Sequence, residues 1–465
     1  MLIRNAEVWG HGLADVHIDQ GRIVCLAPPG ALATMSGPLV DAQGAALLPG
    51  LHDHHIHLAG LAARASSVWC GPPDVEDEAA LALALLTPPG AGWLRGIGYH
   101  ESVMGLPTAH ELDRIVPHRP LRIQHRSGRM WLLNSPALDA LLARAEPPRG
   151  LERQGQRFTG RLFDEDQWLR EALGSEPPDF SEISVQLACF GITGITDMSP
   201  RNDPAMAAHF DRQIARGALV QRCHLAGTLQ LTEAAGEWTL GPAKLHLHEM
   251  ALPSFDEACA FIAAAHRQQR PVAVHCVSEV ELVFTLAVFE EEGVLPGDRV
   301  EHASVTSTDH ALRLADLGIA VCVQPHFVLE RGDRYLIDVE ERHRGDLYRI
   351  ASLRQAGIVL AGGSDAPFAS ADSWHAIHAA VARTTREGRI LGGDEAISPE
   401  QALALYLADP GDLALQRCVA PGEPADLVLL DRPWNSARDN PASGNVQMTL
   451  VAGRVIHDRI DQPPV

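Results

Sequence analysis

Two histidines spaced two residues apart are the strongest chemical signal in the chain. His55 and His57 end an apolar stretch that starts at Leu48 and has the composition of a buried strand. Residues i and i+2 of a strand point to the same side, so both imidazoles can bind one metal ion. A lone His-x-His can also be a polar strand end, so the metal hypothesis needs further ligands.

Four later polar residues fall at intervals that supply such ligands. Lys244, His275 and His302 follow one another after 31 and 27 residues, and Asp365 comes 63 residues after His302. One strand-plus-helix unit takes about 30 residues, so the last interval holds two units. The four residues would then end strands four, five, six and eight of a barrel, on the face where barrel enzymes carry their chemistry. Each alone could be structural, but with the two histidines they predict a metal site.

Lys244 carries a second signal. It is the only lysine, because the other 37 of the 38 basic residues are arginines. A buried lysine can lose its proton and react with carbon dioxide, whereas a guanidinium effectively cannot. The carbamate formed is an anion whose two oxygens can bridge two metal ions. The alternative is the chance retention of one lysine in an arginine-rich chain.

The elements that must position these residues alternate between strand and helix, as in a parallel sheet. Capping-box sequences at Ser254, Ser278 and Ser398 predict three helix starts. The fold class we predict is α/β, with a (β/α)₈ TIM-type barrel. The eight expected barrel strands end near His57, Asp197, Leu225, Leu247, His275, His302, Gln324 and Asp365.

Both chain ends have the alternating pattern of β-hairpins. We expect residues 1–50 and 418–465 to form one small β-sandwich domain, with the barrel domain at 51–417 inserted between them. Two strand-like pieces, at 94–98 and 121–125, do not fit the count of eight barrel strands. We assign them to an insertion at about 66–180 that follows the first barrel strand and lines the pocket.

Composition limits the classes of partner. The formal net charge of −21 argues against nucleic acid and anionic membranes as partners. No apolar run approaches the roughly 18 residues of a membrane span, and the N-terminus does not resemble a signal peptide. The eight cysteines show no regular spacing, which is typical of reduced thiols in a cytoplasmic protein. We therefore expect a cytoplasmic protein with a small-molecule substrate, and a homodimer is left open.

Several motifs give a more specific comparison, and the sequence resembles the amidohydrolase superfamily. Within it, the chain looks most like the third amidohydrolase family, the branch that includes N-substituted formamide deformylases. The superfamily motifs are Leu48–Leu58, Arg299–Ala303 and Gly362–Pro367, and those supporting the branch are Arg126–Ser135, Val323–Pro325 and Pro421–Val428. The resemblance covers most of the chain and identifies no substrate.

The resemblance implies a hydrolase with two divalent metal ions, expected to be zinc. It assigns His55 and His57 to the first ion, His275 and His302 to the second, and carbamylated Lys244 to the bridge between them. Asp365 would bind metal and act as the catalytic base and acid on the water that attacks the substrate. The chain departs from the family at His275–Glu279 and at Arg129, which puts the substrate more than the metals in question.

Substrate contacts are expected from two regions. The insertion offers His125, Arg126, Arg129 and Asn134, although an arginine there can equally form an internal ion pair. Gln324 and His326 follow the seventh strand and could face the pocket. We expect the charged segment from Glu330 to Arg349 to form a loop and a helix over the same rim, with a mobile lid as the weaker alternative.

Three functions remain open at this point. The first is hydrolysis of an amide-type C–N bond in an N-substituted formamide or another N-acyl amine. The second is a different reaction on the same scaffold, either deamination of a heterocycle or opening of a cyclic amide or lactone. The third is a non-catalytic scaffold protein, which the presence of all six expected ligands argues against.

Overall fold

The computed structural model describes residues 1–32, 37–88, 90, 92–174, 177–232 and 236–459. These residues form two compact units. One contains Met1–Leu58 and Asp179–Val465, and the other contains Ala59–Pro178. The second unit lies close to the range expected for the insertion. The terminal strands and the barrel share the first unit, so their division into two domains stays a prediction.

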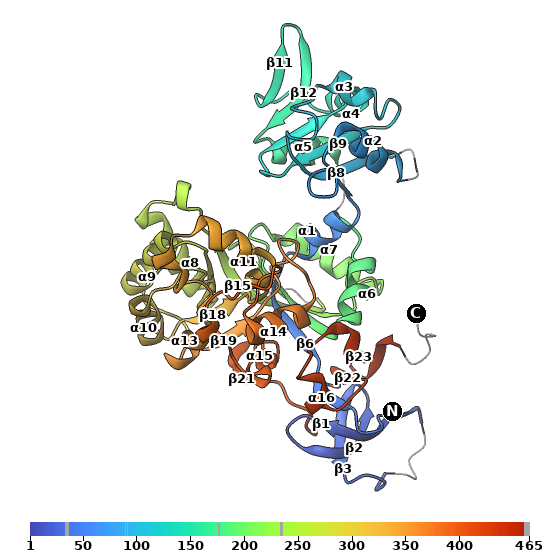
Figure 1. Cartoon of the computed structure of the whole chain (residues 1–465), viewed down its shortest axis with the longest axis vertical. Helices are drawn as coiled ribbons and strands as arrows, with labels where there is room; N and C mark the ends of the chain where they lie inside the picture. The colour runs from blue at the N-terminus through green and yellow to red at the C-terminus, as the bar shows by residue number, and fades with distance from the viewer. Residues whose placement is uncertain (33–36, 89, 91, 175–176, 233–235, 460–465) are drawn as a thin grey trace. The chain divides into compact units, whose positions relative to one another are not determined.

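The first unit is built around eight parallel strands (Figure 1). Each strand pairs with its neighbour in chain order, and an isolated parallel bridge between Ile56 and Ala366 brings the first strand to the segment after the last. The predicted (β/α)₈ fold class is confirmed, with all eight strands close to their expected ends. The barrel strands are β6 (Leu51–Ile56), β13 (Ile192–Asp197), β14 (Arg222–Gly227), β15 (Trp238–His246), β16 (Val272–Cys276), β17 (Arg299–His302), β18 (Ala320–Val323) and β19 (Leu360–Gly362).

Helices follow most of these strands and cover the outside of the barrel (Figure 1). The three predicted capping boxes are present, because the hydroxyls of Ser254, Ser278 and Ser398 each accept a hydrogen bond from the backbone three residues later. The helices are α6 (Ser181–Cys189), α7 (Pro204–Ala215), α8 (Phe255–Arg267), α9 (Glu279–Glu292), α10 (Thr308–Leu317), α11 (His326–Asp338), α12 (Glu341–Arg344), α13 (Ile350–Gln355), α14 (Ser373–Ala382) and α15 (Pro399–Ala404).

The two chain ends meet in one continuous sheet, visible in Figure 1 as blue strands beside red ones. The joint is an antiparallel pairing in which Pro49 lies opposite Leu427. Apolar side chains from both ends share one buried core, which explains how two short segments become stable together. The strands are β1 (Leu2–Val8), β2 (Gly12–Asp19), β3 (Arg22–Ala27), β4 (Leu39–Asp41), β5 (Ala46–Pro49), β22 (Leu427–Leu430), β23 (Val446–Val451) and β24 (Arg454–Asp458).

The second unit has its own six-stranded sheet and its own apolar cores. The two strand-like pieces that did not fit the barrel are β8 and β9, which are parallel neighbours here. The strands are β7 (Val68–Trp69), β8 (Leu94–Tyr99), β9 (Leu121–His125), β10 (Met130–Leu133), β11 (Leu151–Gln154) and β12 (Arg157–Phe163), and the helices are α2 (Glu78–Leu86), α3 (Ala109–Asp113), α4 (Ser135–Leu142) and α5 (Asp166–Leu173). Among the described helices of the chain, none is both long and apolar enough to cross a membrane.

Candidate metal centre

The predicted ligands meet at the carboxyl ends of the barrel strands. His55 lies near the end of β6, Lys244 lies on β15, His275 on β16 and His302 on β17, and Asp365 follows β19. A cavity of about 470 Å³ opens at this end of the barrel. The predicted ligands that line it are His55, His57, Lys244, His275 and Asp365.

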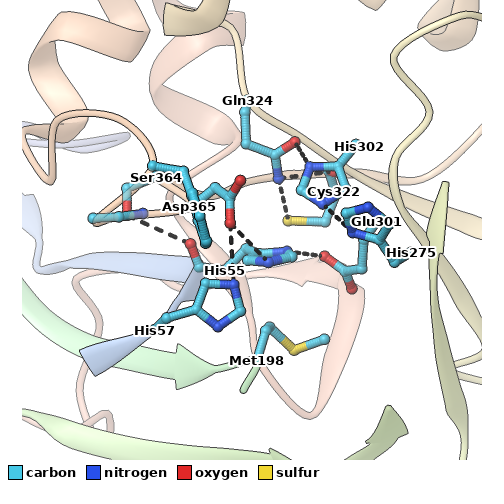
Figure 2. A network of polar contacts seen from close by, with 12 residues as sticks. His55, His57, Met198, His275, Glu301, His302, Cys322, Gln324, Ser364 and Asp365 are labelled. Atoms are coloured by element: carbon cyan, nitrogen blue, oxygen red, sulfur yellow. Dashed lines mark hydrogen bonds and ion pairs between the residues drawn. The ribbon is translucent and has the colours of Figure 1, made fainter. Parts of the chain in front are cut away.

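Asp365 lies against the two histidines of the first motif (Figure 2). Its Oδ1 is 3.4 Å from Nε2 of His55 and 3.1 Å from Nε2 of His57. Burial alone would raise the pKa of Asp365, but hydrogen bonds from both imidazoles outweigh burial and hold that pKa well below its usual value. Asp365 is therefore an anion that faces two imidazole nitrogens, an arrangement suited to a divalent cation.

The backbone brings these groups together. The N–H of Asp365 donates to the carbonyl oxygen of His55 at 2.6 Å, and the N–H of His57 donates to that of Ala366 at 2.8 Å. A Cβ at Gly363 would lie only 2.4 Å from Cβ of His55, so glycine allows the two segments to approach this closely. Residues more than 300 positions apart in the sequence are thereby fixed side by side.

The other predicted histidine pair is equally close. The two rings lie next to each other (Figure 2), and Nε2 of His302 is 3.0 Å from Nδ1 of His275. Burial lowers the pKa of both imidazoles, that of His302 to about 3. Both rings are therefore neutral at physiological pH, which is the form in which histidine binds metal.

Lys244 is the least satisfied group of the site. Its side chain is buried, with 4% of its surface exposed, and its Nζ has no hydrogen-bond partner among the described residues. Burial lowers its pKa, which favours the free amine. A buried ammonium without a partner is costly, so this environment fits a lysine that is neutral or chemically modified.

The donor set as a whole fits a divalent transition metal. His55, His302 and Asp365 offer ligand atoms within 4.8 Å of one another, and so do His55, Glu301 and Cys322. Imidazole, carboxylate and thiolate are the ligands that zinc prefers. The residues present are therefore compatible with the metal centre predicted from the sequence.

Glu301 is a site residue that the sequence analysis did not identify. Its Oε2 accepts a 2.5 Å hydrogen bond from Nδ1 of His55, and its Oε1 accepts one of 2.6 Å from Nε of Arg299. Burial would raise the pKa of Glu301, but the charges of Arg299 and His55 keep it well below its usual value. The carboxylate thus fixes the His55 ring so that Nε2 points at Asp365. A glutamate directly before the predicted ligand His302, two residues after Arg299 on the same short strand, was the available signal.

Gln324 and His326 were predicted to contact substrate, and the structure gives them supporting roles. Oε1 of Gln324 accepts a 2.8 Å hydrogen bond from Nδ1 of His302, which leaves Nε2 of that ring facing His275. His326 donates from Nε2 to the carbonyl oxygen of Ser364 at 2.8 Å. Both side chains are fully buried and neither lines the cavity, because each points back into the strand ends that carry the ligands.

His246 and His248 line the cavity and were also missed. They follow Lys244 at steps of two residues, so all three lie on one side of the chain, as His55 and His57 do. The ring centroid of His246 lies 4.4 Å from that of His275 and 4.6 Å from that of His248. The i, i+2 spacing that identified His55 and His57 as a pair also applies to Lys244, His246 and His248.

The predicted residues of the insertion lie in the second unit. His125 contacts Oε2 of Glu101 through Nε2 at 2.9 Å, and Arg126 is exposed. Arg129 forms the ion pair that was its alternative role, with Nη2 2.7 Å from Oδ2 of Asp164. Contact of His125, Arg126 and Arg129 with substrate stays a prediction.

Asn134, also predicted to contact substrate, has a structural role instead. It is fully buried and is the N-cap of α4, where its Oδ1 accepts from the N–H groups of Leu121 and Ala137. Its Nδ2 donates to the carbonyl oxygens of Val116 and Arg119. No polar atom of its amide is left for a ligand.

The segment from Glu330 to Arg349 forms most of α11 and all of α12. It contributes one wall of the cavity, as expected for a segment over this rim. The lining residues from this segment are Arg331, Tyr335, Val339, Leu347 and Tyr348.

Comparisons with known proteins agree with this geometry. The model of a family described as the amidohydrolase family matches residues 39–457. The N-substituted formamide deformylase of Arthrobacter pascens is 25% identical over 529 aligned residues, which cover 98% of this chain and 97% of that protein.

Solved structures show the same fold. A metal-dependent hydrolase of uncharacterized function from Pyrococcus furiosus superposes with a TM-score of 0.76 at 20% identity, covering 93% of this chain and 98% of the other. Atrazine chlorohydrolase TrzN from Arthrobacter aurescens TC1, in a complex with zinc, gives a TM-score of 0.53 at 16% identity over 98% and 95% of the two chains.

Proposed function

We propose that this chain, which belongs to the amidohydrolase family and is a metal-dependent hydrolase of carbon–nitrogen bonds, cleaves an amide-type bond. The proposed substrate is an N-substituted formamide or another N-acyl amine, and the products are the carboxylic acid and the free amine. The observation that carries the proposal is the buried Nζ of Lys244, which has no partner among the described residues and lies in the cavity that three histidine ligands and Asp365 also line.

We assign the ligands as follows. His55 and His57 would hold one divalent ion and His275 and His302 the second, with zinc as the expected metal. Lys244, as the free amine, would add to carbon dioxide through Nζ, forming one N–C bond and releasing one proton. The carbamate would then be a ligand shared by both ions. Asp365 completes the donor set.

The residues of the chain then divide the reaction between them. When bound, the divalent ions lower the pKa of water and polarise the substrate carbonyl. Asp365 orients the attacking water, accepts its proton at a carboxylate oxygen, and returns that proton to the leaving nitrogen. Glu301 and Gln324 hold the rings of His55 and His302, so that each presents Nε2 to the site.

The proposal extends to the organisation of the chain. Residues 1–50 and 418–465 act as one β-domain that supports the barrel at 51–417. The insertion at 66–180 shapes the entrance through which a small substrate reaches the metal centre. The separate apolar cores of the second unit support the assignment of the insertion as a part of the chain with its own fold.

The test is hydrolysis of a panel of N-substituted formamides and N-acetyl amines by zinc-loaded protein, with detection of the free amine. We expect turnover of at least one member, its loss on chelation, and its return when zinc is added. A zinc-loaded, folded protein that releases no amine from the panel but opens a cyclic amide or deaminates a heterocycle would contradict the proposal.

A further inference from the structure

One face of α11 looks into the cavity of the metal centre. Phe327, Arg331 and Tyr335 are spaced by four residues, which places them in a row along one side of the helix. All three line the cavity. The rest of this wall is apolar or aromatic, with Val305, Val339, Leu347, Tyr348 and Phe368.

The guanidinium of Arg331 is fixed in place by two contacts. Its Nη2 donates a 2.6 Å hydrogen bond to the carbonyl oxygen of Phe368. Its Cζ lies 4.3 Å from the ring centroid of Phe327, within the range of a cation–π contact. A guanidinium has five N–H donors, so this arrangement orients the group and leaves most of its donors unused.

Arg331 has no counter-charge among the described residues, because no carboxylate lies within 4.0 Å of it. The carboxylates of its own helix are engaged elsewhere. Asp333 accepts from Thr385 and Arg389, Asp338 pairs with Arg334, and Oε1 of Glu330 accepts from the N–H of Ser370. A permanent positive charge, on a side chain that is exposed to solvent, therefore lies at the apolar and aromatic wall of the cavity without an ionic partner among the described residues.

We propose that Arg331 binds an anionic oxygen group of the substrate. The substrate class is an amide whose cleaved bond is joined, through a flat or apolar group that packs on the α11 wall, to a carboxylate or a similar oxyanion. Arginine is suited to this role because its planar fork matches the two oxygens of a carboxylate. This inference rests on the proposed function, since it adds the chemical class of substrate to the same site.

The experiment compares two amides that differ by one carboxylate, N-benzylformamide and 4-(formamidomethyl)benzoate. Both are offered to the full-length, zinc-loaded protein. If the protein hydrolyses the two amides, we compare kcat/KM for the anionic amide with kcat/KM for the neutral one. If it does not, we compare their binding constants, measured by calorimetry. The variants are Arg331→Gln and, as a matched control, Arg334→Gln. Arg334 lies on the same helix and does not line the cavity, and its substitution by glutamine removes the same charge.

We expect the wild-type protein to prefer the anionic amide by about tenfold or more, the effect of one charge-assisted bidentate contact. Arg331→Gln should remove this preference, Arg331→Lys should keep part of it, and Arg334→Gln should leave it intact. The inference would be overturned if the wild-type protein showed a ratio near one or did not bind the anionic amide. It would also be overturned if both glutamine variants lost the preference for the anionic amide equally. A binding preference that depends on Arg331 without any hydrolysis would instead overturn the proposed function alone.

Discussion

The barrel rim and the sheet of the second unit both carry histidine–glutamate contacts at strand ends, yet the two places differ in burial. At the rim, His55 and Glu301 are 1% and 0% exposed, and they are 246 residues apart in the chain. In the second unit, His125 and Glu101 are 13% and 54% exposed and only 24 residues apart. Water competes for the second contact but not for the first.

The difference shows what converts strand-end histidines into a metal centre. In the second unit, His125 also contacts the hydroxyl of Ser127 two residues later, so its ring is held by its own turn. At the rim, each ring is held by a side chain from a different strand, namely Glu301 for His55 and Gln324 for His302. Convergence of distant strands thereby turns Nε2 of His55 toward Asp365 and Nε2 of His302 toward His275. The predictions below test whether this distinction holds.

The largest effect is expected at the rim from Asp365→Asn. The amide keeps the shape of the side chain but cannot accept the proton of water, so kcat should fall by about a hundredfold or more. Steady-state kinetics with a hydrolysed amide measures this, and circular dichroism checks that the fold is unchanged. Retention of more than a few per cent of the activity would remove Asp365 from the role of general base.

Lys244→Arg should lose metal and activity together. Arginine keeps a positive charge but forms no carbamate, so the anion that bridges the two sites is missing. Elemental analysis and kinetics on the same preparation give both readouts. Normal metal content with near-normal turnover would contradict the bridge and favour a centre built on His55, His57, His275 and Asp365.

Lys244→Ala sharpens this result. It leaves space in which formate or acetate can replace the missing carboxylate of the carbamate. We expect partial recovery of metal binding with these acids and none with chloride at equal ionic strength. Equal effects of acetate and chloride would indicate a general charge effect instead of a bridging role.

A smaller effect is expected from Glu301→Gln. The variant keeps the shape and an acceptor oxygen but loses the charge that holds His55, so metal affinity should fall by about 10- to 100-fold. Competition with a chelator of known affinity measures this change. An unchanged metal affinity would show that His55 is oriented without Glu301.

The smallest effect on the metal is expected in the second unit. Arg129→Ala removes an exposed ion pair, which contributes little to the free energy of unfolding because water screens it. Metal content should stay constant, while KM or substrate preference changes if the insertion walls the pocket. Loss of metal without any change in the kinetics of the reloaded enzyme would give Arg129 a structural role only.

The structural features that could be predicted from the sequence depend on local patterns. The eight strands, the capping boxes at Ser254 and Ser278 and the row of strand-end ligands all follow from periodicity and regular spacing. The partners of buried polar groups do not. Glu301 meets His55, and Asn134 meets the N–H of Leu121, only after the chain has folded, and nothing in the neighbouring residues indicates these distant partners. The contact of Gln324 with His302 could not be predicted for the same reason.

A metal centre in the barrel of the active protein can be checked by measuring the metal content of purified protein. We expect about two divalent ions per chain, mainly zinc, with activity and metal lost in parallel on dialysis against a chelator and restored in parallel by zinc. Elemental analysis that finds no stoichiometric metal in gently purified, fully active protein would contradict the account.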